Sequence, residues 1–142
     1  MPIEIRDLDD GFGVLIKGTG YMTAKEYHSA IMEHLSKPHE RLEKYLYTIS
    51  DYTEVKKYDL NLSYIHEIAN ECIAVSKINK HVILTFATQD MVFYSVLKLF
   101  VGLAKLTKWN MQVFKNRADM DKWLTIKLRQ KFGRDNFKFD YD

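Results

Sequence analysis

The stretch His81-Val82-Ile83-Leu84-Thr85-Phe86-Ala87 decides the fold class of this 142-residue chain. Its central residues are apolar without alternation, which is typical of a strand covered on both faces, and we expect it to be the central strand of a sheet. An apolar stripe at helical spacing, with Asp59 as its N-cap, runs from Leu62 to Ile73 before it, and a second helical segment follows over 91–106. A strand between two helices predicts a parallel α/β sheet, because a helix usually supplies the crossover between parallel strands.

Four further strands are predicted around this one. They cover residues 3–5, 12–16, 45–50 and 109–113. The first two form a hairpin, because Asp10-Gly11 between them tolerates the positive φ of a tight turn. The strand at 45–50 is rich in aromatic and β-branched residues and ends at Asp51, and a polar loop follows over 52–58.

Two more helices complete the pattern. The first begins at a capping box of Thr23 and Glu26 and ends before Pro38. The last runs from Asn116 to a stop at Gly133, and we expect Trp123, at the centre of its apolar stripe, to be its largest anchor. The order ββαβαβαβα predicts one α/β domain over residues 1–133, with a mixed five-stranded sheet and helices packed against it.

Residues 134–142 form a tail in which Phe137, Phe139 and Tyr141 alternate with polar residues. The alternation is compatible with a sixth, edge strand or with an arm that pairs with another chain. It is equally compatible with a terminus whose aromatic side chains rest on the parent domain.

The composition excludes several classes of protein. A content of 46% hydrophobic and 28% charged residues is that of a globular domain. Twenty-one basic and nineteen acidic residues give a net charge of +2, which indicates no nucleic-acid partner. Neither a membrane span of about 20 apolar residues nor a signal peptide is expected. The single cysteine, Cys72, excludes an internal disulfide and fits a cytoplasmic, reducing location.

One group of four polar residues could act in catalysis. Asp59, Ser63, His66 and Asn70 are three or four residues apart and would line one edge of a helix. We favour a solvated helix edge over catalysis, because the backbone amides beside a mid-helix serine are already committed and leave no oxyanion hole. We therefore assign no catalytic residue, and a small hydrolase that uses His66 with Ser63 or Asp59 is the alternative.

No metal site or cofactor is expected. The stretch His66-Glu67-Ile68-Ala69-Asn70 lacks the second histidine that would place two imidazoles on one helix face. Cys72 lies within an apolar stripe, where a small core residue is the favoured interpretation over a nucleophile.

The helix at 91–106 is apolar over more of its circumference than one buried face requires. Its polar residues fall in a narrow stripe, and apolar residues cover about 220° of the remainder. The polar stripe consists of Ser95, Lys98, Gly102 and Lys105. The flank formed by Val92, Leu99 and Leu106 is expected to meet a neighbouring helix, a second subunit or a lipid-like ligand.

Two local patterns resemble the SpoIIAA-like branch of the STAS (sulphate transporter and anti-sigma factor antagonist) superfamily. Residues 20–27 are similar to the "G-x-hydrophobic-T-x-E-D-Y" entry to the first helix of that branch. Residues 114–124 are similar to its ending, in which a Phe closes the last strand and a Trp-Leu pair anchors the last helix. The resemblance spans about residues 3–126 and implies a bacterial STAS-like domain with a mixed sheet, no cofactor, and work done by binding.

The resemblance also identifies where a phosphorylation switch would lie. In anti-sigma factor antagonists the regulated serine precedes the second helix, and the corresponding stretch here is 59–62. Asp59 matches the pattern, but no serine follows it, and Ser63 lies a turn further along, so we expect no switch.

The function expected from the sequence is a non-enzymatic STAS-like module that binds a protein or a ligand. We expect a homodimer, with a protein partner or an apolar ligand beside the helix at 91–106. The branch is often grouped by name with Sec14-like lipid carriers, so a carrier of a lipid-like small molecule is a further alternative.

Overall fold

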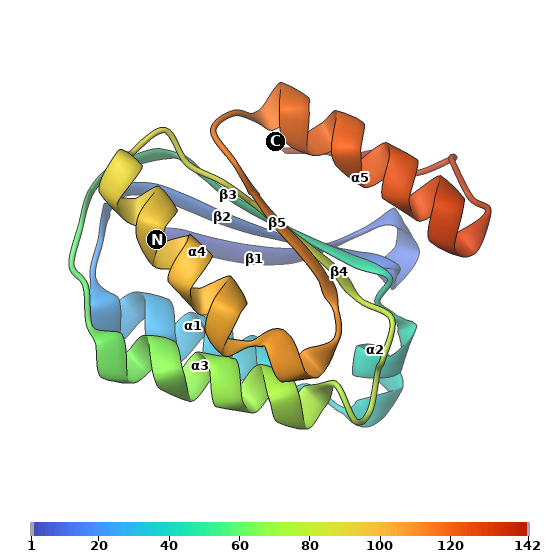
Figure 1. The fold of residues 1–142 in the computed structure, drawn as a ribbon, viewed down its shortest axis with the longest axis horizontal. Helices are drawn as coiled ribbons and strands as arrows, with labels where there is room; N and C mark the ends of the chain where they lie inside the picture. The colour runs from blue at the N-terminus through green and yellow to red at the C-terminus, as the bar shows by residue number, and fades with distance from the viewer. Residues whose placement is uncertain (1, 142) are drawn as a thin grey trace.

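The computed structural model describes residues 2–141 and contains all five predicted strands (Figure 1). The strands are β1 (Ile3–Leu8), β2 (Gly13–Met22), β3 (Tyr47–Tyr58), β4 (Ile83–Ala87) and β5 (Asn110–Phe114). They lie side by side in chain order, with β1 antiparallel to β2 and every other neighbouring pair parallel. The predicted α/β class and mixed sheet are therefore confirmed.

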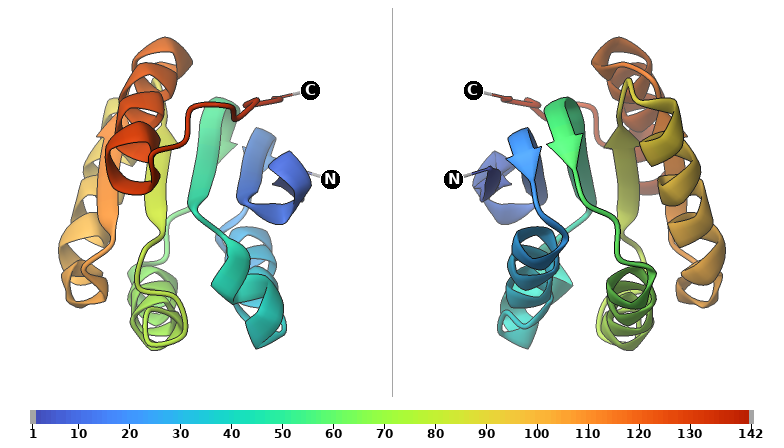
Figure 2. Two further views of the ribbon diagram at one scale, coloured as in Figure 1. Left: turned by 90° about the vertical axis from the view of Figure 1, so that its right-hand side faces the viewer. Right: turned by 90° about the vertical axis from the view of Figure 1, so that its left-hand side faces the viewer.

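Helices cover both faces of the sheet (Figure 2). The helices are α1 (Ala24–Leu35), α2 (His39–Lys44), α3 (Leu62–Val75), α4 (Met91–Leu103) and α5 (Arg117–Phe132), with short 3-10 turns η1 (Asp9–Gly11) and η2 (Lys105–Thr107). The first four helices pack on one face and α5 packs on the other. Helix α2 was not predicted, because its six residues bury only Leu42 and carry no helical period.

Strand β4 is buried on both faces, as predicted, but it is not the central strand. All five of its residues are buried, and β5 pairs with its outer edge. The central strand is β3, between β2 and β4. A continuous apolar run indicates that a strand is buried on both faces, but it does not indicate the position of the strand in the sheet.

Strand β3 is also longer than predicted, so the expected loop over 52–58 is wrong. The strand continues through Asp51, because this carboxylate is paired with Arg117 inside the protein instead of ending the strand in solvent. Beyond Asp51 the strand pairs with β2 but not with β4. This two-stranded extension leaves alternate side chains exposed, which accounts for its polar composition.

The predicted helix starts are largely confirmed. The side chains of Thr23, Asp90 and Asn116 each accept a hydrogen bond from a backbone N–H in the first turn of α1, α4 and α5. Helix α3 differs, because its N-cap is Asn61 and not Asp59.

Three residues other than Trp123 anchor helix α5. Met120, Leu124 and Leu128 are fully buried against the sheet. Trp123 is only half-buried and lies beside Phe114, so the prediction that it is the main anchor is wrong. The three buried residues are spaced four apart and point at the sheet, whereas position 123 lies at the edge of that stripe.

The described part of the tail, residues 134–141, forms no strand and rests on the parent domain. The rings of Phe137 and Phe139 pack edge-on against Tyr47, with centroid distances of 5.5 and 5.3 Å. The Arg6 guanidinium and the Lys17 ammonium donate hydrogen bonds to the backbone carbonyls of Asp140 and Tyr141. The tail therefore completes the cover of the face on which α5 lies.

We predict that Leu124→Ala destabilises the protein by about 2–5 kcal/mol, because it removes fully buried methyl groups and leaves a cavity. Trp123→Ala should cost about 1 kcal/mol, since the indole is only partly buried. Urea unfolding followed by circular dichroism measures both changes. A larger loss for Trp123→Ala than for Leu124→Ala would contradict this assignment of the anchor.

Candidate functional site: an internal cavity

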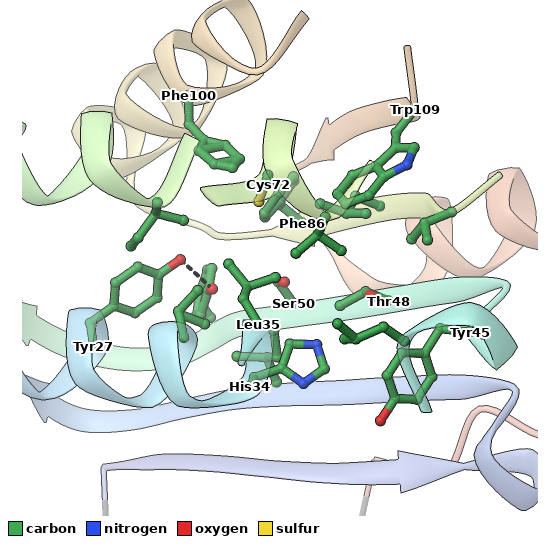
Figure 3. Close-up of a pocket in the computed structure, with 18 residues that line it drawn as sticks. Tyr27, His34, Leu35, Tyr45, Thr48, Ser50, Cys72, Phe86, Phe100 and Trp109 are labelled. Atoms are coloured by element: carbon green, nitrogen blue, oxygen red, sulfur yellow. Dashed lines mark hydrogen bonds between the residues drawn. The ribbon is translucent and has the colours of Figure 1, made fainter. Parts of the chain in front are cut away.

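A cavity of about 60 Å³ lies between the sheet and helices α1 and α3 (Figure 3). Eighteen residues line it, and all of them except the half-buried Tyr27 are buried. Native cores contain few voids larger than one water molecule, which occupies about 30 Å³ in the liquid. The cavity therefore has room for about two waters or one very small organic molecule.

The lining is mainly apolar, with a few hydroxyl groups among aromatic and aliphatic side chains. Phe86 and Phe100 contribute rings from β4 and α4, and Trp109 contributes one from the residue before β5. Thr48 and Ser50 contribute hydroxyl groups from β3, where alternate residues face the same side of the sheet. None of the eighteen lining residues is Asp, Glu, Lys or Arg.

The imidazole of His34 is the least satisfied polar group of the lining. Its side chain is 7% exposed, and among residues 2–141 no side chain or backbone group forms a hydrogen bond with its Nδ1 atom. Burial lowers the pKa of His34 to about 4, and the positive charge of Lys37 acts in the same direction. At neutral pH the ring is uncharged, so one of its nitrogens is a donor and the other an acceptor.

Tyr45 separates this imidazole from the surface. The two ring centroids are 5.6 Å apart. On its outer side the Tyr45 hydroxyl donates to Asp7 Oδ1 at 2.9 Å and accepts from Lys37 Nζ at 3.2 Å. Burial and the hydrogen bond to Asp7 raise the pKa of Tyr45 to about 12. Tyr45 also borders a polar hollow on the surface, together with Asp7 and Arg41.

Three other polar side chains of the lining have hydrogen-bond partners. The hydroxyls of Tyr27 and Tyr52 share a hydrogen bond of 2.8 Å, and the indole N–H of Trp109 donates to the carbonyl of Asn79 at 2.8 Å. Burial raises the pKa of the Cys72 thiol to about 12, so this side chain is an uncharged core residue, as predicted. Among the fully buried side-chain nitrogen and oxygen atoms of the lining, His34 Nδ1 is the one without a hydrogen-bond partner in residues 2–141.

The polar residues predicted on α3 lie away from this cavity. Ser63, His66 and Asn70 are exposed, and the Asp59 carboxylate accepts a hydrogen bond from Tyr21 at 2.8 Å. Within residues 2–141, no hydrogen bond joins any two of the four. The fold therefore does not assemble them into a nucleophile and its base.

The helix predicted over 91–106 ends earlier, because α4 stops at Leu103 and Leu106 lies in the 3-10 turn η2. The apolar flank predicted on this helix is solvent-exposed. Val92, Leu99 and Leu106 are 60%, 45% and 75% exposed, respectively. None of the three lines the cavity, which α4 reaches through Phe100 on its opposite side.

Sequence patterns did contain a signal for the cavity. His34 falls beside Leu35 in the apolar stripe of α1, and a histidine there is unusual for a buried face. Thr48 and Ser50 are two small hydroxyl residues at alternating positions of an otherwise aromatic and aliphatic strand. Only the pairing of β3 opposite α1 brings the three residues to one place.

A charged cluster on the opposite face of the sheet is the second candidate site. Asp51 is fully buried near the point where β3 leaves β4, a position typical of ligand sites in α/β sheets. Its carboxylate accepts hydrogen bonds from Arg117 Nε at 2.7 Å and from Thr53 at 2.7 Å. The ring of Tyr141 lies 4.9 Å from the Arg117 guanidinium. These groups neutralise each other under the tail, so we interpret the cluster as structural.

Two classes of site find no support among residues 2–141. No group of three or more His, Cys, Asp or Glu side chains in this part of the chain could hold a metal ion. Each of its helices is too short or too polar to cross a lipid bilayer.

We predict that His34 makes the protein sensitive to mild acid. Its pKa of about 4 in the folded chain lies below the ordinary value of 6.5, so the unfolded chain binds a proton that the native chain does not. The free energy of unfolding is therefore unaffected by His34 above pH 6.5, and protonation of His34 in the unfolded chain lowers it by about 3 kcal/mol as the pH approaches 4. Urea unfolding between pH 7 and 4.5 should show that the free energy of unfolding falls less in His34→Leu than in wild type. In the surface variant His39→Leu it should fall as much as in wild type. Equal pH slopes in wild type and His34→Leu would contradict the prediction.

Comparison with known proteins yields one solved structure. No family model matches the chain, and no curated protein matches it. A crystal structure of an uncharacterized protein from Shewanella loihica PV-4, described as a DUF3478 family member with a SpoIIAA-like fold, is 17% identical to this chain. The match covers 86% of this chain and 91% of that one, with a TM-score of 0.49.

Proposed function

We propose that this chain is a non-enzymatic, SpoIIAA-like binding module that holds a small, mainly apolar ligand in the cavity beside His34. The cavity is the observation that carries the proposal. At about 24 cal/mol per Å³, an empty void of 60 Å³ costs about 1.4 kcal/mol of stability. Ligand sites are typically concave and mainly apolar, with a few polar groups that fix orientation, and this lining has that composition.

The ionisation of the lining favours binding over catalysis. A general base works best when its pKa is near the operating pH, and His34, with a pKa of about 4, is a weak base. The Cys72 thiol, with a pKa of about 12, remains protonated and is a poor nucleophile. The alternative hydrolase on α3 has less support, because its residues are exposed and not hydrogen-bonded to each other.

A second part of the proposal concerns the exposed side of α4 and of the turn η2 that follows it. Val92, Leu99 and Leu106 form an apolar flank, and we propose that a second copy of this chain covers it. The flank is apolar over its length, so the same surface on a twin subunit can pack against it about a two-fold axis. Left in water, such a surface promotes association.

Two substitutions at one position test the cavity. Cys72→Met fills it with a flexible apolar side chain, whereas Cys72→Ala enlarges it. Native mass spectrometry of protein purified from its own host should show a retained small molecule on wild type and on Cys72→Ala, and none on Cys72→Met. Thermal denaturation of both variants confirms that each is folded. A wild-type protein without any bound molecule, or equal retention by all three forms, would contradict the proposal.

The proposed dimer predicts the effect of a charge on the exposed side of α4. Leu99→Glu should convert a dimer to a monomer with an intact fold, because a buried carboxylate without a partner is strongly unfavourable. Lys98→Glu, at an exposed polar position one residue away, is the matched control and should leave the dimer intact. Sedimentation velocity and circular dichroism provide the measurements. A monomeric wild-type protein rules out the dimer.

A further inference from the structure

We infer that the ligand of this cavity is an uncharged molecule with a hydroxyl head group at His34 and an apolar body along the remaining lining. The inference rests on the proposed function, and it names the chemical class of the ligand. The groups that carry it are the uncharged lining, the imidazole without a partner, and the cations that lie outside Tyr45.

The electrostatics of the cavity exclude a charged head group. No lining residue is Asp, Glu, Lys or Arg, so an ion inside would lose its hydration without gaining a counter-charge. The cations closest to His34 are already paired. Arg41 Nη2 lies 2.8 Å from Asp7 Oδ2, and Lys37 Nζ lies 3.8 Å from Asp7 Oδ1.

These cations are also separated from the cavity by an aromatic ring. Lys37 and Arg41 contact the hydroxyl of Tyr45, while the ring of Tyr45 faces His34 and lines the cavity. A fatty-acid carboxylate at His34 would therefore have to break the contacts of Asp7 to reach a cation. A neutral head group requires no such rearrangement.

The imidazole selects a head group that can both donate and accept. A neutral histidine presents one N–H donor and one acceptor nitrogen, and His34 Nδ1 has no partner in residues 2–141. A hydroxyl can satisfy either nitrogen, because it is donor and acceptor at once, and it is small enough for a cavity of about 60 Å³. A carboxylate cannot donate, and a hydrocarbon leaves the nitrogen unsatisfied.

The arrangement of the side chains orients the molecule. In Figure 3, Thr48 and Ser50 lie between the His34 ring and the rings of Phe100 and Trp109. A hydroxyl head would lie among the first three residues. The apolar body would then contact the aromatic rings.

The chain offers its own fluorescent reporter of occupancy. It has two tryptophans, of which Trp109 lines the cavity and Trp123 lies on the opposite face of the sheet. In the variant Trp123→Phe, Trp109 is the single tryptophan. Three two-carbon probes, chosen to fit the cavity of about 60 Å³, are then titrated at pH 7: ethanol, acetate and chloroethane.

We expect ethanol to produce a saturable change in Trp109 fluorescence with an affinity about tenfold higher than that of chloroethane, since one hydrogen bond separates them. Acetate should produce no saturable change. In the added variant His34→Leu, ethanol should lose its advantage over chloroethane, whereas in His39→Leu it should keep that advantage. In parallel, 15N NMR of wild type should show the His34 imidazole signals shift with ethanol, a readout that does not depend on the variant folding.

The possible outcomes separate the inference from the proposed function. If all three probes bind equally well, or if ethanol leaves the His34 signals unchanged, the inference is overturned and the binding function stands. If acetate binds best, the head group is anionic and the inference is also overturned. If no probe perturbs Trp109 and a crystal structure places only water at His34, the binding function itself fails.

Discussion

Burial of strand β3 on both faces is the constraint on which the rest of this structure depends. One face of the strand presents Tyr47 and Ile49, which are fully buried under α5 and the tail. The other face presents Thr48 and Ser50 to the layer of α1 and α3. Because a parallel sheet needs cover on both sides, each flanking layer is required for the strand to remain paired with β2 and β4. The cavity lies in one of these layers, at the point where the central strand carries small polar side chains instead of large apolar ones.

The layer opposite the cavity consists of a helix and an irregular segment. Helix α5 covers β4 and β5 with a stripe of apolar residues, and the aromatic rings of the tail cover Tyr47. Between helix and tail, Asp51 is fully buried, so its charge depends on Arg117 and on the donors of Thr53. A buried ion pair contributes little net stability, but loss of one partner leaves an uncompensated charge. The pair therefore makes the position of α5 on the sheet specific.

The two ends of the cavity differ in how their polar groups are satisfied. Tyr27 and Tyr52 bond to each other, so that end needs no further partner. At the other end His34 has no hydrogen bond through Nδ1, and Tyr45 turns its own hydroxyl outward to Asp7 and Lys37. A buried donor or acceptor without a partner is unfavourable, so such a group persists where something besides the chain can satisfy it. This contrast is the reason that the candidate site is placed at His34 and not at the better satisfied, exposed residues of α3.

The sequence by itself determined the elements, because the signals for them are local. Helical spacing, caps such as Thr23 and Asn116, and the turn at Asp10-Gly11 act over a few residues and require no distant partner. Only the tertiary structure decided which strand is central, why β3 continues past Asp51, and which residue of α5 is the anchor. Each of these depends on a partner far along the chain, as Asp51 depends on Arg117, 66 positions away. The cavity, too, was decided only by the tertiary structure. A void arises where side chains of separate elements fail to fill the space between them, and no single segment carries that information.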